Sequence, residues 1–269
     1  MLRVHRGDTG PRVVLLQALL NAKGASLTID GLFGPKTQAA LVAFQDLIPL
    51  RKRGEANEDT WPALVRDSGL EIVDAVDAGD PDHAEGSNIN KHAGTRVLLT
   101  GAMSNGVQNV VRRVIQQAGA PRSIGLLRLW GHGNLGRWLT ITVGDVVHTA
   151  EADPAIGRAV AREWRSYLDL DHFEALAPTL PQWRPYFAPF ASVEHHGCSL
   201  ARVAKTRTLM HRLADLWDVP VTAGFTDQWI PYDKPSAFRF QGRTYTAYPR
   251  HENLSSWARS AGASQSICR

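Results

Sequence analysis

Apolar residues recur at helical spacing in three short segments of the first 67 residues. The first segment, residues 11–23, begins with a proline suited to a first helical turn and is followed by Gly24, which is suited to a helix end. Its apolar positions are Val13, Leu16, Leu19 and Leu20. Residues 35–47 repeat the pattern, and residues 57–65 begin with an asparagine suited to cap a helix. The pattern predicts three short helices in this part of the chain.

Beyond residue 94, short apolar runs alternate with amphipathic segments. The runs predict strands at residues 96–100, 125–130, 139–143, 191–195 and 219–223, and the amphipathic segments predict helices at residues 107–118 and 202–217. Such alternation is typical of an α/β domain with a mainly parallel sheet. In such sheets ligands bind beyond the carboxyl ends of the strands. The predicted fold is therefore α/β, with a small three-helix N-terminal domain and a larger sheet domain.

Charge is distributed unevenly along the chain. Residues 71–85 hold six acids and no lysine or arginine, which favours a solvated linker: Glu71, Asp74, Asp77, Asp80, Asp82 and Glu85. The predicted domains are residues 1–67 and 94–269, joined by an acidic linker at 68–93. Residues 91–269 carry 21 bases against 13 acids, which favours polyanionic surroundings such as a cell wall.

Composition excludes several classes of protein. Hydrophobic residues make up 43% of the 269 residues, but no run approaches the roughly 18 apolar residues of a membrane span. The bases are scattered and form no basic helix, so nucleic acid is not favoured as a partner. Two cysteines exclude a disulfide framework and a four-cysteine zinc site. Residues 1–8 lack the apolar core of a secretory signal, so wall, periplasmic or secreted localisation is expected to use another route.

Several short motifs of the first 67 residues resemble one known module. They are Arg6–Gly10, Leu16–Leu20, Asp30–Thr37, Phe44–Gln45 and Thr60–Trp61. Together these motifs are similar to the peptidoglycan-binding domain with three helices, and the resemblance implies that peptidoglycan is a partner.

The same resemblance assigns roles to the turn between the first two predicted helices. It implies that Gly31, Gly34 and Phe44 serve the fold, and that Asp30, Phe33 and Thr37 are candidates for the binding groove. The sequence departs from the module after Gln45, where the basic run 50–53 replaces a short apolar turn.

Two predicted strands end in motifs that contain histidine, cysteine and glycine. Residues 130–136 read Trp-Gly-His-Gly-Asn-Leu-Gly, and residues 193–201 read Val-Glu-His-His-Gly-Cys-Ser-Leu-Ala. Cysteine attacks as a thiolate, and a nearby imidazole lowers its pKa or protonates the leaving group. Glycine beside both His132 and Cys198 keeps the backbone open to a substrate. The pattern therefore predicts a Cys-His dyad, against the alternative of a buried thiol and a turn histidine.

The order of these motifs resembles the caspase and gingipain clan of cysteine peptidases. An apolar strand with His132-Gly133 precedes an apolar strand with Gly197-Cys198, and the pair is most similar to a caspase-like domain of large bacterial surface proteins. The resemblance implies Cys198 as nucleophile, His132 as general acid and base, and the Gly133 and Cys198 N–H groups as the oxyanion hole. It implies no metal or other cofactor.

Other residues near the predicted strand ends are weaker candidates. His195, His196 and Cys198 suggest zinc, but adjacent strand residues point to opposite faces, so His195 does not easily join the other two. Both histidines are therefore interpreted as structural or substrate-lining. Asp145 and Asp227 follow strands and are candidates for selecting a basic substrate group. Cys268 is near the terminus, either without a role or able to cap Cys198 in an oxidised form.

These features predict a wall-targeted cysteine peptidase or amidase. Its substrate is a stem peptide or a wall-associated protein, and a phage lysin or an effector of type VI secretion fits the missing signal. The alternatives are a non-catalytic wall-binding or adhesion protein with the same fold, and a zinc amidase.

Overall fold

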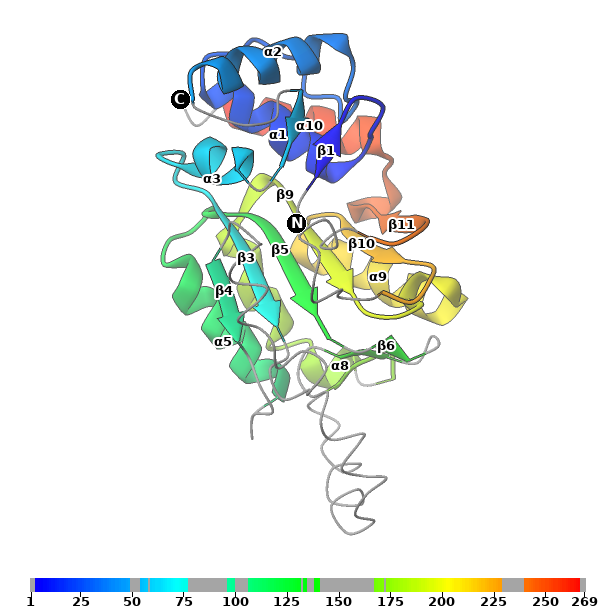
Figure 1. The fold of residues 1–269 in the computed structure, drawn as a ribbon. Helices are drawn as coiled ribbons and strands as arrows, with labels where there is room; N and C mark the ends of the chain where they lie inside the picture. Colours follow the sequence, from blue (N-terminus) through cyan, green and yellow to red (C-terminus); the bar gives the residue numbers. More distant parts are fainter. Residues whose placement is uncertain are drawn as a thin grey trace.

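Helices and a central sheet make up the protein, which we describe from a computed structural model (Figure 1). The structure describes residues 3–48, 54–57, 59–76, 96–99, 106–131, 133–134, 138–140, 167–171, 173–228 and 240–266. An N-terminal helical module lies at the end of the sheet where β3 begins (Figure 1).

The N-terminal module contains the three helices that the sequence predicts. They are α1 (Pro11–Ala22), α2 (Pro35–Asp46) and α3 (Thr60–Val65), and β1 (Val4–His5) pairs antiparallel with β2 (Glu55–Ala56). Both α1 and α2 begin with a proline, whose fixed φ suits the first turn. Helix α1 is buried along most of its length, because it packs on α2 and α3 and also on the sheet domain.

A six-stranded sheet forms the larger part of the protein, in the order β11-β10-β9-β5-β3-β4. The strands are β3 (Glu71–Val76), β4 (Arg96–Leu99), β5 (Ile124–Trp130), β9 (Phe187–His196), β10 (Val221–Gly224) and β11 (Thr244–Ala247). All neighbours pair in parallel except β10 and β11. The α/β prediction with a mainly parallel sheet is confirmed. The chain leaves β3 toward β4 but leaves β5 toward β9, so β3 and β5 flank the topological switch point.

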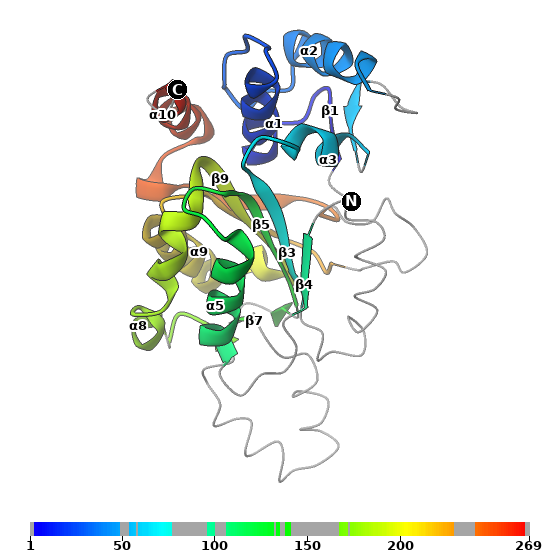
Figure 2. The same cartoon turned by 90° about the vertical axis from the view of Figure 1, so that its left-hand side faces the viewer.

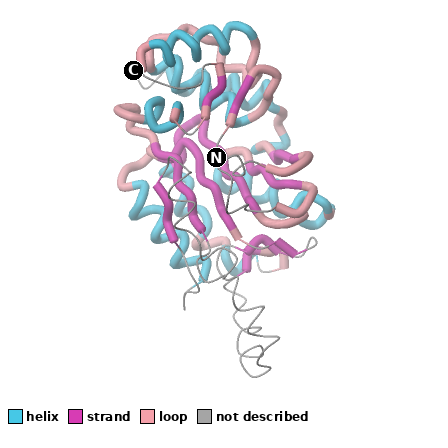
Figure 3. Tube along the Cα trace, viewed as in Figure 1, coloured by secondary structure: helices cyan, strands magenta, loops and turns pink. Residues whose placement is uncertain are grey.

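Helices cover one face of this sheet (Figure 2). These are α5 (Gly106–Ala118), α8 (Phe173–Leu176) and α9 (Ala204–Trp217). The described residues also form the 3-10 helices η2 (Leu180–Tyr186), η3 (Leu200–Arg202) and η5 (Pro249–His251). A small antiparallel sheet contains β6 (Gly133–Asn134), β7 (Trp138–Thr140) and β8 (Tyr167–Leu168), and Figure 3 shows it apart from the main sheet.

The acidic linker prediction is wrong for residues 71–76, which form β3 near the middle of the sheet. Asp74 is fully buried there, and its carboxylate accepts a hydrogen bond from Arg128 of β5 at 2.6 Å. Acidic residues are therefore not necessarily exposed to solvent when a neighbouring strand supplies a basic partner. The predicted strand at 139–143 is also corrected: its described part belongs to β7 of the small sheet.

The N-terminal module and the sheet domain share one hydrophobic core. Helix α10 (Leu254–Ser266), near the end of the chain, packs against α1. Gly31 of the module has φ +73°, and a Cβ atom there would lie 2.7 Å from Leu254 Cδ1. The backbone conformation thus favours glycine, and the contact with α10 leaves little space for a side chain. Among the described helices, none combines the length and apolar character that a membrane span needs.

Candidate functional site

Two buried glutamines hold the loops of the N-terminal module. Gln17 Oε1 accepts hydrogen bonds from the backbone N–H groups of Asp30 and Gly31 at 3.1 and 2.9 Å. Its Nε2 donates to Asp30 Oδ1 at 2.8 Å and to Thr37 Oγ1 at 3.2 Å. Gln45 similarly accepts from the Gly54 N–H at 2.7 Å and donates to the Glu55 carbonyl at 2.8 Å. The module motifs therefore include an internal hydrogen-bond framework.

The structure places the three groove candidates of this module within or beside that framework. Phe33 and Thr37 are each only 3% exposed, so neither side chain is available to a wall polymer in this conformation. Asp30 binds the Gln17 amide and also accepts from the Leu32 N–H at 2.8 Å. Phe33 and Thr37 are therefore packed inside the module, and their role in wall binding stays a prediction.

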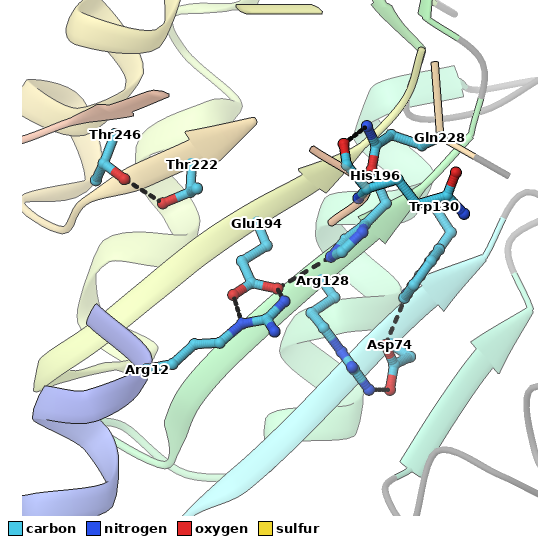
Figure 4. Close-up of polar contacts among 10 residues, drawn as sticks. Arg12, Asp74, Arg128, Trp130, Glu194, His196, Thr222, Gln228 and Thr246 are labelled. Atoms are coloured by element: carbon cyan, nitrogen blue, oxygen red, sulfur yellow. Dashed lines mark hydrogen bonds and ion pairs between the residues drawn. The ribbon is translucent and has the colours of Figure 1, made fainter. Parts of the chain in front are cut away.

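A row of polar side chains crosses the middle of the main sheet. Register pairs Asp74 with Arg128, Arg128 with Glu194, and Glu194 with Thr222. All four are buried, and Arg128 is completely so. Figure 4 shows Arg128 reaching Asp74, while Thr222 Oγ1 lies 3.0 Å from Thr246 Oγ1. The central strands thus carry paired charges where an ordinary core would carry apolar residues.

Glu194 connects this row to the N-terminal module. Arg12 of α1 reaches across and forms a bidentate ion pair with Glu194, with its Nη2 at 2.6 Å from Oε2 (Figure 4). His196 Nε2 lies 3.0 Å from the same Oε2. Although burial alone raises the pKa of Glu194, the Arg12 guanidinium and His196 hold it well below its usual range. The carboxylate is therefore ionised, and it binds the two parts of the protein together.

His196 is packed between two aromatic rings at the end of β9. Its ring stacks on Trp130 at 4.0 Å and on Phe240 at 4.2 Å between centroids. Trp130 Nε1 in turn donates to Asp74 Oδ1 at 2.7 Å. Burial lowers the pKa of His196 to about 4, so the ring is neutral at neutral pH. His196 was predicted to be structural or substrate-lining, and its surroundings favour the structural role.

His195 is buried among different neighbours from His196. Neither ring nitrogen has a hydrogen-bond partner within the described part of the chain. Burial lowers the pKa of His195 to about 3. The described residues contain no group of three or more His, Cys, Asp and Glu side chains arranged to hold a metal ion.

Cys198 lies two residues beyond the end of β9 and is half-buried. Its Sγ lies 3.7 Å from the Gln228 carbonyl oxygen. The next residue, Ser199, has φ +54°, and its Oγ donates to Asp227 Oδ1 at 2.7 Å. Asp227, a candidate for substrate selection, thus supports the turn that carries Cys198. Burial raises the pKa of the Cys198 thiol, and the Asp227 carboxylate raises it further.

His132 lies outside the described residues, as do Asp145 and Cys268. Gly133 belongs to β6, directly after it. The strand register nevertheless relates the two catalytic candidates. Trp130, the last residue of β5, is the register partner of His196, the last residue of β9. His132 and Cys198 each follow two positions later in the sequence.

The buried polar row was not predicted from the sequence. Arg12 and Arg128 were not singled out, Asp74 was counted only among the acids of the predicted linker, and Glu194 was noted only as part of the cysteine motif. One signal was available, because acids and an arginine interrupt otherwise apolar strands at Asp74, Arg128 and Glu194. The arginine that completes the ion pair lies 182 residues from Glu194, so only the folded chain reveals the partnership.

Comparisons with known proteins identify the N-terminal module. Residues 9–64 match the family model described as "Putative peptidoglycan binding domain". No curated protein matches the chain by sequence. The crystal structure of the Burkholderia AP3 phage endolysin aligns with 66% of this chain and 61% of its own, at 22% identity and a TM-score of 0.23. This chain thus spans about three fifths of that endolysin, and the likeness is too slight to support an argument. Residues 9–64 are therefore a peptidoglycan-binding domain, carried at the N-terminal side of an α/β protein.

Proposed function

We propose that the protein is a wall-targeted cysteine hydrolase that uses Cys198 as nucleophile and His132 as general acid and base. The observation that carries this proposal is the pairing of Trp130 with His196 at the ends of adjacent parallel strands. Two residues beyond that pair, one strand is followed by a histidine and the other by a cysteine. The last residues of β5 and β9 lie at the carboxyl edge of the sheet, where α/β proteins bind ligands, and β5 borders the switch point.

The proposed reaction cleaves an amide in two steps. His132 takes the proton from Cys198 Sγ, and the thiolate attacks the carbonyl carbon. The Gly133 and Cys198 N–H groups stabilise the oxyanion of the tetrahedral intermediate. The intermediate collapses as the C–N bond breaks and His132 donates its proton to the leaving amine. Water, deprotonated by His132, then hydrolyses the thioester and restores the thiol.

A base is essential to this scheme, because burial and Asp227 raise the pKa of the Cys198 thiol. Without a base, little thiolate forms at neutral pH. The turn itself is well supported: the Ser199 N–H donates to the Thr226 carbonyl at 3.0 Å, in addition to the bond from Ser199 Oγ to Asp227. The nucleophile is therefore held in a fixed position, while its ionisation depends on the partner histidine.

The peptidoglycan-binding domain favours the wall polymer as substrate, and an amide of the stem peptide is the proposed bond. The raised pKa of Cys198 favours a second candidate, a non-catalytic wall-binding protein in which Cys198 is an inert thiol.

Digestion of intact sacculi distinguishes the two candidates. Purified wild type, Cys198→Ala and His132→Ala are incubated with sacculi, and soluble products are read by mass spectrometry. We expect wild type alone to release stem-peptide fragments, while all three proteins sediment with insoluble wall. Release by Cys198→Ala would exclude this nucleophile, and absence of release by wild type would favour the binding protein. Loss of sedimentation in Cys198→Ala would contradict the proposal that wall binding and hydrolysis belong to separate parts of the chain.

A further inference from the structure

A pocket rimmed by arginines lies at the opposite end of the sheet from Cys198. Its volume is about 580 Å³, and its walls come from the start of β9, the end of α9 and the inner side of α10. Phe187, the first residue of β9, lines it. Strand register sets Phe187 opposite Ile124 and His196 opposite Trp130, which lies six residues further along β5 at about 3.3 Å each, so the pocket is roughly 20 Å from the strand end that leads to Cys198. It is therefore separate from the proposed dyad.

The charged residues that line this pocket are three arginines and one acid: Arg122, Arg184, Arg250 and Asp218. Asp218 pairs with Arg184 at 3.2 Å and also with Arg250. The Arg184 and Arg250 side chains remain 57% and 55% exposed, so their guanidinium groups are accessible to a solute. Arg250 also pairs with Glu252 at 3.0 Å, so three arginines face two acids here, and the one positive charge in excess complements an anionic ligand.

Backbone conformation provides a second observation. Arg122, Asp218 and Arg250 all adopt positive φ, at 59°, 59° and 53°. Glycine adopts this region without steric cost, whereas arginine does so rarely. Two of the arginines at the pocket thus occupy positions where glycine would be the relaxed residue. Asp218 ends α9, where this conformation is common, but the strain at Arg122 and Arg250 is of the kind that is found at ligand-binding sites.

The pocket adjoins the peptidoglycan-binding domain. A second, more apolar pocket of about 190 Å³ shares Arg122, Ala188 and Pro189 with it. That second pocket is lined on its other side by Ala18 and Ala22 of α1. We call the two together the arginine groove, which passes from α1 to Arg250. A single extended ligand that occupies this groove contacts both parts of the chain.

We propose that the arginine groove binds the carboxylate-bearing stem peptide of peptidoglycan, as a site distinct from the one where the bond is cleaved. Stem peptides are short, rich in small apolar side chains and terminated by free carboxylates. Arginine binds carboxylates in a fork geometry, and the alanine-lined part of the groove accommodates methyl groups. This assignment rests on the proposed function for its choice of polymer, but the binding does not require hydrolysis.

The test measures binding in the Cys198→Ala background, so that no probe is consumed. Calorimetric titration compares a disaccharide-tetrapeptide with the same compound after amidation of its carboxylates. We expect the acidic form to bind about tenfold more tightly, and Arg184→Glu to remove that difference. Arg112→Glu, the same charge change on the exposed side of α5, is the matched control and is expected to bind as the parent does.

Arg122→Gly separates loss of binding from loss of folding. Because glycine relaxes the backbone at φ +59°, this variant is expected to keep or raise Tm while its affinity for the acidic probe falls. Equal affinity for both probes, or unchanged affinity in Arg184→Glu and Arg122→Gly, would overturn the site. Carboxylate-dependent binding by a protein that releases nothing from sacculi would uphold the site and reject the hydrolase. Release from sacculi by a protein whose groove variants bind normally would uphold the hydrolase and reject the site.

Discussion

Trp130 and His196 are register partners at the last positions of two adjacent parallel strands, and their rings stack at 4.0 Å with 14° between planes. The stack fixes both strand ends, because His196 is also bonded to Glu194 and Trp130 to Asp74. The turn that carries Cys198 therefore starts from a strand end that ring stacking and hydrogen bonds hold in place. This relationship connects the buried polar row to the position of Cys198.

The ion pair between Arg12 and Glu194 is expected to contribute strongly to stability. Arg12→Met leaves a buried carboxylate without its cation, and we expect the free energy of unfolding to fall by about 3 kcal/mol. Adding Glu194→Gln removes the charge while keeping a hydrogen-bonding group for His196, so at least about 1 kcal/mol should be recovered. Urea denaturation measures both changes.

The exposed pair of Lys205 and Asp171 is the control for that experiment. Lys205→Met should cost less than about 1 kcal/mol, because water screens the charges. If Arg12→Met costs no more than this control, the two parts of the protein are not joined by the buried pair.

Lowering the pH is expected to destabilise the protein at pH values well above those at which carboxylates usually titrate. Burial lowers the pKa of His195 to about 3 and that of His196 to about 4, against an ordinary value of 6.5. At pH values between the lowered and the ordinary pKa, both histidines are protonated in the unfolded chain but neutral in the folded protein. The free energy of unfolding therefore falls as the pH drops from about 6.5 toward 4. The depressed pKa of Glu194 acts in the same direction at lower pH, because protonating its paired carboxylate removes the ion pair.

His195→Leu should reduce this pH dependence. The variant removes an imidazole whose nitrogens have no partner in the described part of the protein, so the slope should decrease by up to about 1.4 kcal/mol per pH unit. Urea midpoints at pH 7, 5.5 and 4.5 give the slope. An identical slope in wild type and variant would show that His195 is not held neutral by burial.

Gln17 is expected to be essential to the peptidoglycan-binding domain. Gln17→Ala leaves the buried Gly31 N–H and the Thr37 hydroxyl without the amide that they contact, which should cost about 2 kcal/mol of stability and weaken sedimentation with wall. Gln108→Ala, on the exposed surface of α5, is the matched control and should change neither property. Normal sedimentation and unfolding in Gln17→Ala would show that the turn holds without this framework.

Local patterns predicted much of the fold. Helices α1, α2 and α5 and strands β5, β9 and β10 lie where hydrophobic spacing places them, because each buries an apolar face or run. Strand β3 was not predicted, because its acids are typical of a solvated linker, whereas Asp74 pairs with Arg128 through a strand pairing that a single sequence does not display. Strand β11 and helix α10 were missed as well, because polar residues dominate both: β11 is an edge strand, and α10 is amphipathic.

The candidate site was predictable in type but not in its supporting residues. The glycines beside His132 and Cys198, at the ends of predicted strands, form a local pattern that is visible in the sequence alone. The packing of His196 between Trp130 and Phe240, and the reach of Arg12 to Glu194, depend on long-range contacts. The burial of Phe33 and Thr37 was likewise not predictable, because the motif contains both structural and binding residues and does not distinguish them.

The pH dependence of alkylation at Cys198 tests the proposed dyad without any assumption about substrate. Iodoacetamide labelling is followed on the Cys198 peptide by mass spectrometry, in wild type and in His132→Ala, with Cys268→Ala present in both. The account predicts that wild type reacts with an apparent pKa below the ordinary thiol value, and that His132→Ala shifts it above that value, as burial and Asp227 dictate. Coincident profiles for the two proteins would contradict the central claim that His132 activates Cys198.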